Sequence, residues 1–249
     1  MHAGNRAGAY FIRRGVWRWL IPIGAVLGIL VLAPHISWGH SHEAKTLRFV
    51  EQVLLESEYG QRFGAVTRWV KSPKIRVVGG TEEDRLAVTA LVDELNELLD
   101  GMGVSLTVAR FGEADIGADI KVIIAPLQNF PRLARGHDFE YVEGNVGFFY
   151  IWFDHQYEIT QAVVLIGAEL TSGERQATIV QEITQALGPA NDSPLFPSSV
   201  FFERGEVGST ATRLAPIDRK LLRFLYTHLR PGDDAEAIRR AFEQHWGSQ

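Results

Sequence analysis

The stretch TIVQEITQALGPAND, residues 178–192, limits the possible folds more than any other part of this sequence. On a helix that advances about 100° per residue, Val180, Ile183 and Leu187 fall on one face, which must therefore pack against other parts of the chain. Gly188 permits the left-handed conformation that ends many helices, and Pro189 prevents the helix from continuing. These residues predict a helix over about 173–187 with one buried face.

The opposite face of this predicted helix is polar and consists of Thr178, Gln181, Glu182 and Gln185. Because the chain reverses after Gly188, Asn191 and Asp192 could return toward this polar face. A polar face opposite a buried one is expected to contact solvent. The substitution Glu182→Gln is then expected to change the free energy of unfolding by about 0.5 kcal/mol or less.

Strand and helix patterns alternate through the chain from residue 42 onward. Apolar residues at helical spacing predict helices over 42–58, 81–99 and 216–229, and a last helix that Asp233 caps. The second of these helices begins with Thr81 and Asp84, which are spaced like a capping box.

Runs rich in β-branched and apolar residues predict strands over 74–78, 104–111, 119–126 and 162–167. Residues 127–158 are predicted to be irregular apart from the aromatic stretch 146–153, which favours a core strand over the wall of a binding cleft. The order of elements predicts a single α/β (α+β) domain over 43–249, with a mixed sheet and C-terminal helices.

The N-terminus predicts attachment to a membrane. Four arginines within residues 1–18 precede an apolar run over 19–36, and a helix needs roughly 20 apolar residues to span a bilayer. Basic residues before the run place residues 1–18 in the cytoplasm and the domain outside it, periplasmic or extracellular. Ser37 and Gly39 leave open a cleaved signal peptide instead of a single-pass anchor.

Composition excludes several functions. The chain has no cysteine, which rules out disulfides, thiolate nucleophiles and cysteine-ligated zinc. Its net charge is -5, and no basic stripe occurs outside the N-terminus, so nucleic acid is not an expected partner.

The helix pattern resembles two families. The segment QEITQALGPAND is similar to the E-x-x-Q-x-L-G-x-x-N-D motif of an uncharacterised bacterial domain family of unknown function. More remotely it resembles the metzincin zinc peptidases, whose H-E-x-x-H-x-x-G-x-x-H/D helix carries the metal ligands. The segment LAPIDRKLLRFLYTHLRPG is similar to the closing helix of such domains. The resemblance implies a metzincin-like fold with an active-site-type helix.

The departures from the metzincin pattern bear on activity. Gln181, Gln185 and Asn191 stand where the zinc ligands would be, and neutral amides are weak zinc ligands. No metal or other cofactor is therefore expected. Glu182 keeps the position of the catalytic glutamate and would be the general base if any hydrolysis survived. With Gln181, Gln185, Asn191 and Asp192 it is predicted to form a polar cleft that binds a peptide or a cell-envelope component.

Two alternatives remain open at this point. The first is an active metallohydrolase with unconventional ligands, in which Glu182 and Asp192 supply the charge, helped by His137–Asp138 or Asp154–His155 from the long loop. The second is a structural module of an envelope complex whose cleft is vestigial.

Overall fold

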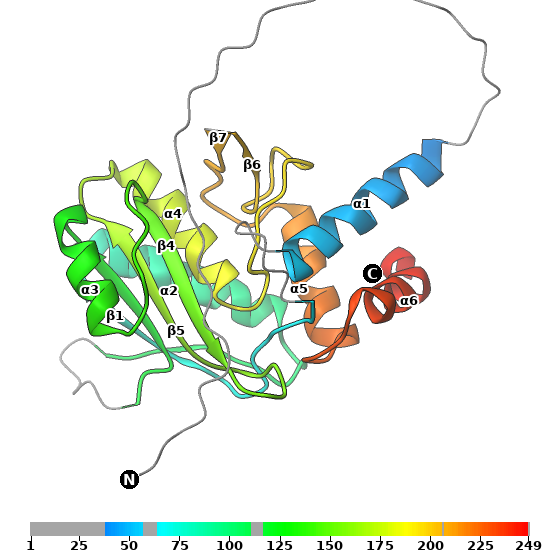
Figure 1. Cartoon of the computed structure of the whole chain (residues 1–249), viewed down its shortest axis with the longest axis horizontal. Coiled ribbons are helices and arrows are strands. Elements are labelled where there is room, and N and C mark those ends of the chain that lie inside the picture. Colours follow the sequence, from blue (N-terminus) through cyan, green and yellow to red (C-terminus); the bar gives the residue numbers. More distant parts are fainter. Residues whose placement is uncertain (1–37, 57–63, 111–116, 206, 249) are drawn as a thin grey trace, which may run out of the picture.

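A mixed sheet forms the centre of the domain in the computed structural model, which describes residues 38–56, 64–110, 117–205 and 207–248 (Figure 1). Its strand order is β2-β1-β3-β5-β4. The first four strands in this order are parallel: β2 (Thr107–Val108), β1 (Lys74–Gly79), β3 (Ile120–Ala125) and β5 (Ile159–Gly167). The edge strand β4 (Gly147–Phe153) runs antiparallel to β5. The mixed sheet expected from the element order is confirmed.

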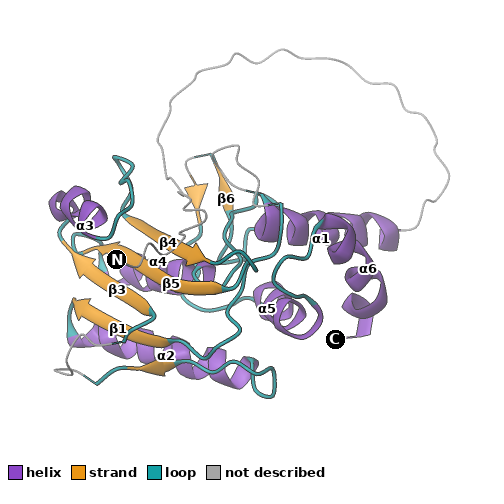
Figure 2. Cartoon of the chain, turned by 60° about the horizontal axis from the view of Figure 1, so that its bottom comes forward, coloured by secondary structure: helices purple, strands orange, loops and turns teal. Residues whose placement is uncertain are grey.

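Both faces of the sheet are covered, and the two layers form separate cores. Helices α2 (Glu82–Leu98) and α4 (Ser172–Gln185) lie side by side on one face (Figure 2). The short helices η1 (Leu127–Asn129) and α3 (Phe130–Gly136) cover part of the other face, above an aromatic cluster around Phe139. Strands buried on both faces need no polar alternation, which explains the nearly continuous apolar sequence of β3 and β5.

Three helices gather at one end of the sheet: α1 (Trp38–Leu55), α5 (Pro216–His228) and α6 (Ala235–His245), with η2 (Trp246–Ser248) after them (Figure 1). The ring of Phe224 in α5 meets those of Phe242 and Trp246, which fixes α6 on α5. His228 and His245 stack at a ring-centroid distance of 4.1 Å, and desolvation together with His245 lowers the pKa of His228. A small hairpin, β6 (Glu203–Arg204) and β7 (Val207–Gly208), lies in the long loop before α5.

None of the helices in the described ranges is long and apolar enough to cross a bilayer. The predicted span over 19–36 lies outside the described residues.

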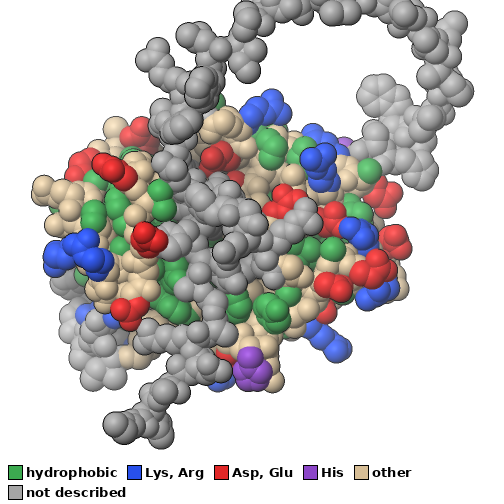
Figure 3. Space-filling view, in the orientation of Figure 1, with side chains coloured by type: hydrophobic (Ala, Val, Ile, Leu, Met, Phe, Trp, Pro, Cys, Tyr) green, Lys and Arg blue, Asp and Glu red, His purple; other side chains and the backbone are tan. Residues whose placement is uncertain are grey.

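Acidic and basic side chains are interspersed over the described part of the face in Figure 3.

Two predicted elements are corrected, and one is confirmed. Residues 130–136 form α3, which the prediction of an irregular 127–158 missed. The last helix is capped by Asp234, whose carboxylate accepts from Ala237 N, while Asp233 accepts from Arg230 N in the preceding turn. The capping box of Thr81 and Asp84 at the start of α2 is confirmed.

The predicted strand over 104–111 is much shorter than its alternating sequence suggested. Only Thr107 and Val108 pair with β1 among the described residues. Before them, the side-chain amide of Asn96 on α2 bonds both backbone groups of Leu106, at 2.7 Å and 2.9 Å. The side chain of Asn96 thus takes the place of the neighbouring strand as the hydrogen-bond partner of Leu106. Residue 111 of the predicted strand lies outside the described residues.

Candidate functional site

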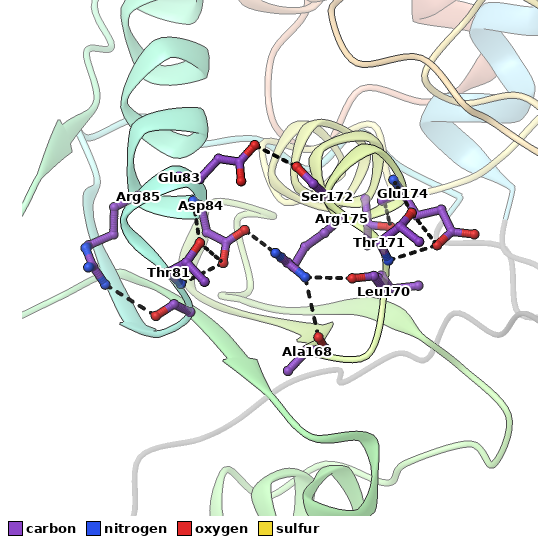
Figure 4. A network of polar contacts seen from close by, with 12 residues as sticks. Thr81, Glu83, Asp84, Arg85, Ala168, Leu170, Thr171, Ser172, Glu174 and Arg175 are labelled. Carbon is purple, nitrogen blue, oxygen red and sulfur yellow. Dashed lines mark hydrogen bonds and ion pairs between the residues drawn. The ribbon is translucent and has the colours of Figure 1, made fainter.

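The N-terminus of α4 is fixed by its own cap and by α2. Thr171 and Glu174 form a capping box, in which Thr171 Oγ1 accepts from Glu174 N and the glutamate carboxylate accepts from Thr171 N. One turn later, Arg175 Nε donates to Asp84 Oδ1 at 2.5 Å (Figure 4). Arg175 also donates to Leu170 O at 2.6 Å. The start of α4 is thereby tied to α2 and to the turn after β5.

The ion pair between Asp84 and Arg175 is nearly buried, with side chains 6% and 11% exposed. Burial opposes ionisation of Asp84, but the hydrogen bonds from Arg175 and Thr81 outweigh it and lower its pKa. The carboxylate is therefore charged at neutral pH, and its ion pair with Arg175 orients α4 against α2.

The end of α4 is fixed by two aromatic side chains from distant parts of the chain. Trp69 Nε1 donates to Ala186 O at 2.9 Å, and Tyr226 Oη donates to Leu187 O at 2.8 Å. Burial raises the pKa of Tyr226, so its hydroxyl keeps the proton that this bond needs. These donors satisfy carbonyls that a helix end leaves without a partner.

Gly188 has a φ of 130°, and a Cβ there would lie 2.3 Å from Thr67 O. A residue with a side chain would have to shift the backbone at this point. The close approach of Gly188 to Thr67 therefore requires glycine where the sequence predicted the end of the helix. Regular helix ends slightly earlier than predicted, at Gln185.

The polar face of α4 is buried, which contradicts the expectation of a solvent-exposed face. Gln181 is 2% exposed, Glu182 is 3% exposed and Gln185 is fully buried. The apolar face, including Ile183, is buried as well. Periodicity showed which residues share a face, but it could not show that both faces would be covered. The prediction that Glu182→Gln would be a neutral surface change therefore loses its basis.

Asp192 is the centre of the polar contacts below α4. Its Oδ1 accepts from Gln185 Nε2 at 2.9 Å and from Gln181 Nε2 at 3.2 Å. The turn at Gly188 returns the chain far enough to bring this carboxylate under both glutamines. We refer to Gln181, Gln185 and Asp192 as the amide–carboxylate cluster.

Asn191 points away from this cluster and toward α1. Its Nδ2 donates to Gln52 O at 3.1 Å, and its backbone N–H donates to Val53 O at 3.2 Å. Ser193 Oγ adds a bond of 2.9 Å to Gln52 Oε1. Gln52 and Ser193 were missed from the sequence. The only signal for Gln52 was a polar residue next to the apolar stripe of a predicted helix.

Glu182 faces the first residue of β4. A Cβ at Gly147 would lie 2.2 Å from Thr178 Cγ2 and 3.2 Å from Glu182 Oε1. The absence of a side chain at Gly147 thus lets α4 approach the edge strand and places the carboxylate beside its backbone. The sequence did not single out Gly147, because it lies at the start of the aromatic stretch 146–153, which predicted only a core strand.

The donor set of the cluster does not fit a zinc ion. Zinc needs lone pairs from deprotonated ligands, whereas both glutamines turn their N–H groups toward the nearby carboxylate. In the described parts of the chain, no three His, Asp or Glu side chains are grouped to hold a metal ion. Two acceptors, Gln185 Oε1 and Asn191 Oδ1, are buried without a hydrogen-bond partner, which suits an ordered water.

The loop residues that the metallohydrolase alternative adds to the site lie elsewhere. Asp154 closes the turn between β4 and β5, where its carboxylate accepts from Gln156 N and Glu158 N. His137 stacks on Phe139, on the face of the sheet opposite α4. Neither pair folds over the amide–carboxylate cluster. The aromatic strand 147–153 belongs to the core, as its sequence favoured.

Fold and site together define an α/β domain whose central helix carries a buried cluster of amides around one carboxylate. The chain matches the family described as "Protein of unknown function (DUF2927)" over residues 43–244 and belongs to it. The expected membership in a domain family of unknown function is thus confirmed at the level of the family.

No curated protein matches the sequence. Two solved structures of myroilysin are similar at 14% and 13% identity, over 67% and 81% of this chain and 100% of theirs. Their TM-scores of 0.38 and 0.39 are too low to support an argument about function.

Proposed function

We propose that this chain is a non-catalytic binding domain that recognises a peptide or another component of the bacterial cell envelope. The ligand would reach the domain at Asp192, the partly exposed member of the amide–carboxylate cluster. The buried glutamines behind it would hold the carboxylate in one orientation. A fixed carboxylate is suited to a cationic or N–H-rich ligand, such as the amino groups and amides of a peptide.

One observation carries the non-catalytic part of this proposal. Gln181 and Gln185 both direct N–H donors at Asp192, where metal-assisted hydrolysis would need acceptors. The alternative of an active metallohydrolase, with Glu182 and Asp192 as its anionic groups, would require these amides to turn away.

Attachment to a membrane through residues 19–36 is a second part of the proposal and rests on the sequence pattern alone. A reporter enzyme that is active only outside the cytoplasm, fused after Gln249, is expected to be active. Activity of a reporter that works only in the cytoplasm would overturn the orientation.

The central experiment measures metal content and binding on the same purified full-length protein. After dialysis against zinc, elemental analysis is expected to find far less than one zinc per chain, and labelled casein should remain uncleaved. One equivalent of zinc that is absent from Asp192→Asn, together with cleavage of casein by the wild-type protein, would instead support the metallohydrolase.

Binding is tested by sedimentation with purified cell-wall sacculi. The wild-type protein is expected to pellet with them, and Asp192→Asn should pellet much less. Asp93→Asn, an exposed acidic residue of α2, is the matched control and should behave like wild type. Equal sedimentation of all three proteins would contradict a role for Asp192, and circular dichroism verifies that each variant is folded.

A further inference from the structure

Helices α2 and α4 leave a groove between them at the surface of the domain. Val88 and Leu91 of α2 are buried in the core, whereas Leu86 and Ala90 are exposed on another side of the same helix. A hollow of about 280 Å³ lies on this side, and all the residues that line it belong to α2 or α4. The groove is therefore formed entirely by two well-placed helices.

The lining of this groove is mostly apolar. Ala87 and Ala90 contribute from α2, and the fully buried Ile179 contributes from α4. Leu86 lies beside them and is 61% exposed. An apolar side chain from another molecule would lose its contact with water against this lining, which favours binding.

The first turns of the two helices are linked across one end of the groove. Ser172 Oγ donates to Glu83 Oε1 at 2.7 Å, next to the ion pair of Asp84 with Arg175 (Figure 4). These contacts fix the distance between α2 and α4, so the groove keeps its width without a ligand. A surface that is already arranged for binding loses less conformational freedom when a partner docks.

The groove favours a helix as its occupant. The backbone groups within a helix bond to one another, so α2 and α4 offer no open edge with which an extended segment could pair. A partner must therefore bind through its side chains. Two helices that lie side by side can receive the ridge of side chains on a third helix, with apolar residues three or four positions apart.

The charge of α2 favours a basic partner. This helix contains six acidic residues and one basic residue, Arg85, which falls on the opposite side from Glu83. Glu83, Ala90 and Glu97 are spaced so that they follow one line along the helix. The hydroxyl bonded to Glu83 leaves its negative charge in place, and Glu97 is exposed and forms no ion pair within the described ranges.

We propose that the groove between α2 and α4 binds a basic amphipathic helix of a partner protein. The apolar side chains of this helix lie against Leu86 and Ala90, while its lysines or arginines meet Glu83 and Glu97. The groove lies along the first half of α4, whereas Asp192 contacts the second half. The proposal therefore does not depend on the function assigned to Asp192.

The experiment uses the full chain and a fluorescein-labelled peptide of about five helical turns, with leucines every third or fourth position among lysines and alanines. Fluorescence anisotropy is expected to show saturable binding, and the same peptide with glutamate in place of lysine should not bind. Glu97→Lys should weaken binding roughly fivefold or more, because it reverses a charge that meets the ligand. Glu140→Lys, an exposed glutamate after α3, is the matched control and should change the affinity by less than about twofold.

A second variant tests the apolar contact. Leu86→Ala should weaken binding roughly tenfold, because it removes most of the exposed apolar side chain in the groove. Thr89→Ala, an exposed position of α2 that does not line the groove, should leave the affinity unchanged. An unchanged affinity for Leu86→Ala would show that charge alone attracts the peptide and would contradict a docked helix. Circular dichroism verifies that each variant is folded.

Three further results would overturn the proposal. The first is no saturable binding of the basic peptide up to about 1 mM. The second is equal competition by spermine, a polyamine without a large apolar surface, which would indicate a site for small cations. The third is binding that appears only after residues 1–18 are removed, which would make the arginine-rich N-terminus of this chain the occupant.

Discussion

Asp192 accepts hydrogen bonds from two buried glutamine amides, so its removal should be costly. Asp192→Ala leaves the Nε2 groups of Gln181 and Gln185 without this acceptor. A buried donor that loses its acceptor costs about 1–3 kcal/mol, so the free energy of unfolding is expected to fall by at least that amount. Urea denaturation measures it, with Asp93→Ala as the surface control.

A double-mutant cycle separates this contact from other effects of the substitution. Once Asp192 is alanine, Gln185→Leu should cost less than it does in the wild-type chain, because the shared hydrogen bond is already gone. Strictly additive effects would show that the amide and the carboxylate do not stabilise each other.

Two glycines provide a matched pair of substitutions. Gly147→Ala places a Cβ 2.2 Å from Thr178 Cγ2 and should destabilise the domain by about 1–3 kcal/mol, since α4 must move. Gly173→Ala, in the first turn of the same helix, meets nothing within 4 Å and should be neutral or stabilising. Thermal unfolding compares them. An unchanged melting temperature for Gly147→Ala would mean that α4 and β4 pack less tightly than described.

For single residues, the sequence predicted which side chains lie close together but not what surrounds them. Helical spacing and the turn at Gly188 indicated that Gln181, Gln185 and Asp192 could meet. Their burial depends on segments far away in the chain, such as the end of α1 with Gln52, and no local pattern carries that information.

Among the elements, the loop before α5 is held by one buried carboxylate. Asp218 is fully buried and accepts from Ser199 Oγ, Val200 N and Ala215 N. Desolvation outweighs these hydrogen bonds and raises its pKa to about 6. Between about pH 4 and pH 6 the folded state therefore binds a proton more tightly than the unfolded state does.

The free energy of unfolding is thus expected to fall as the pH rises through this range. Two pKa units correspond to roughly 2–3 kcal/mol from this group. Asp218→Asn resembles the protonated carboxyl, since its oxygen can accept from the backbone while its amide donates to Ser199. Urea denaturation at pH 4, 5 and 6 should show a flatter dependence for this variant. Asp84 has a lowered pKa, and its contribution is lost only at more acidic pH. If the free energy of unfolding depended on pH in the same way for the wild type and Asp218→Asn, the role assigned to the Asp218 carboxyl would be ruled out.

The elements that could be predicted are those whose pattern is set by their own residues. The aliphatic runs of β3 and β5 and the caps of α2 are of this kind. The aromatic and turn-rich sequence around Phe130 hid α3, because a helix of seven residues shows too few turns to display a period. The alternating sequence before Thr107 suggested a long strand, but Asn96 takes the backbone of Leu106 instead.

At the scale of the molecule, the larger of the two hydrophobic cores runs from Phe49 in α1 to Trp246 after α6. Because the helices and strands that contribute to this core pack against one another, the domain is expected to unfold in a single transition. Phe224→Ala should destabilise it by about 3–5 kcal/mol. Circular dichroism and tryptophan fluorescence should then shift to the same lower urea midpoint. Separate midpoints for the two probes would indicate that the C-terminal helices form an independent unit.

The class of fold followed from the order of strands and helices, since short connections between alternating elements leave few arrangements. The packing of α1, α5 and α6 at one end of the sheet could not be derived in the same way. It depends on contacts between the two ends of the chain, such as the pairing of Glu51 with Arg239.

The two aromatic donors at the end of α4 determine when the domain can close during synthesis. Trp69 is made long before Ala186, but Tyr226 follows Leu187 by 39 residues. When α4 has just emerged from the ribosome, the chain still lacks Tyr226, whose hydroxyl donates to Leu187 O, and the rest of α5. The sheet and α4 must therefore wait, with apolar surface exposed, until α5 has emerged, and during that interval the nascent domain is most exposed to aggregation.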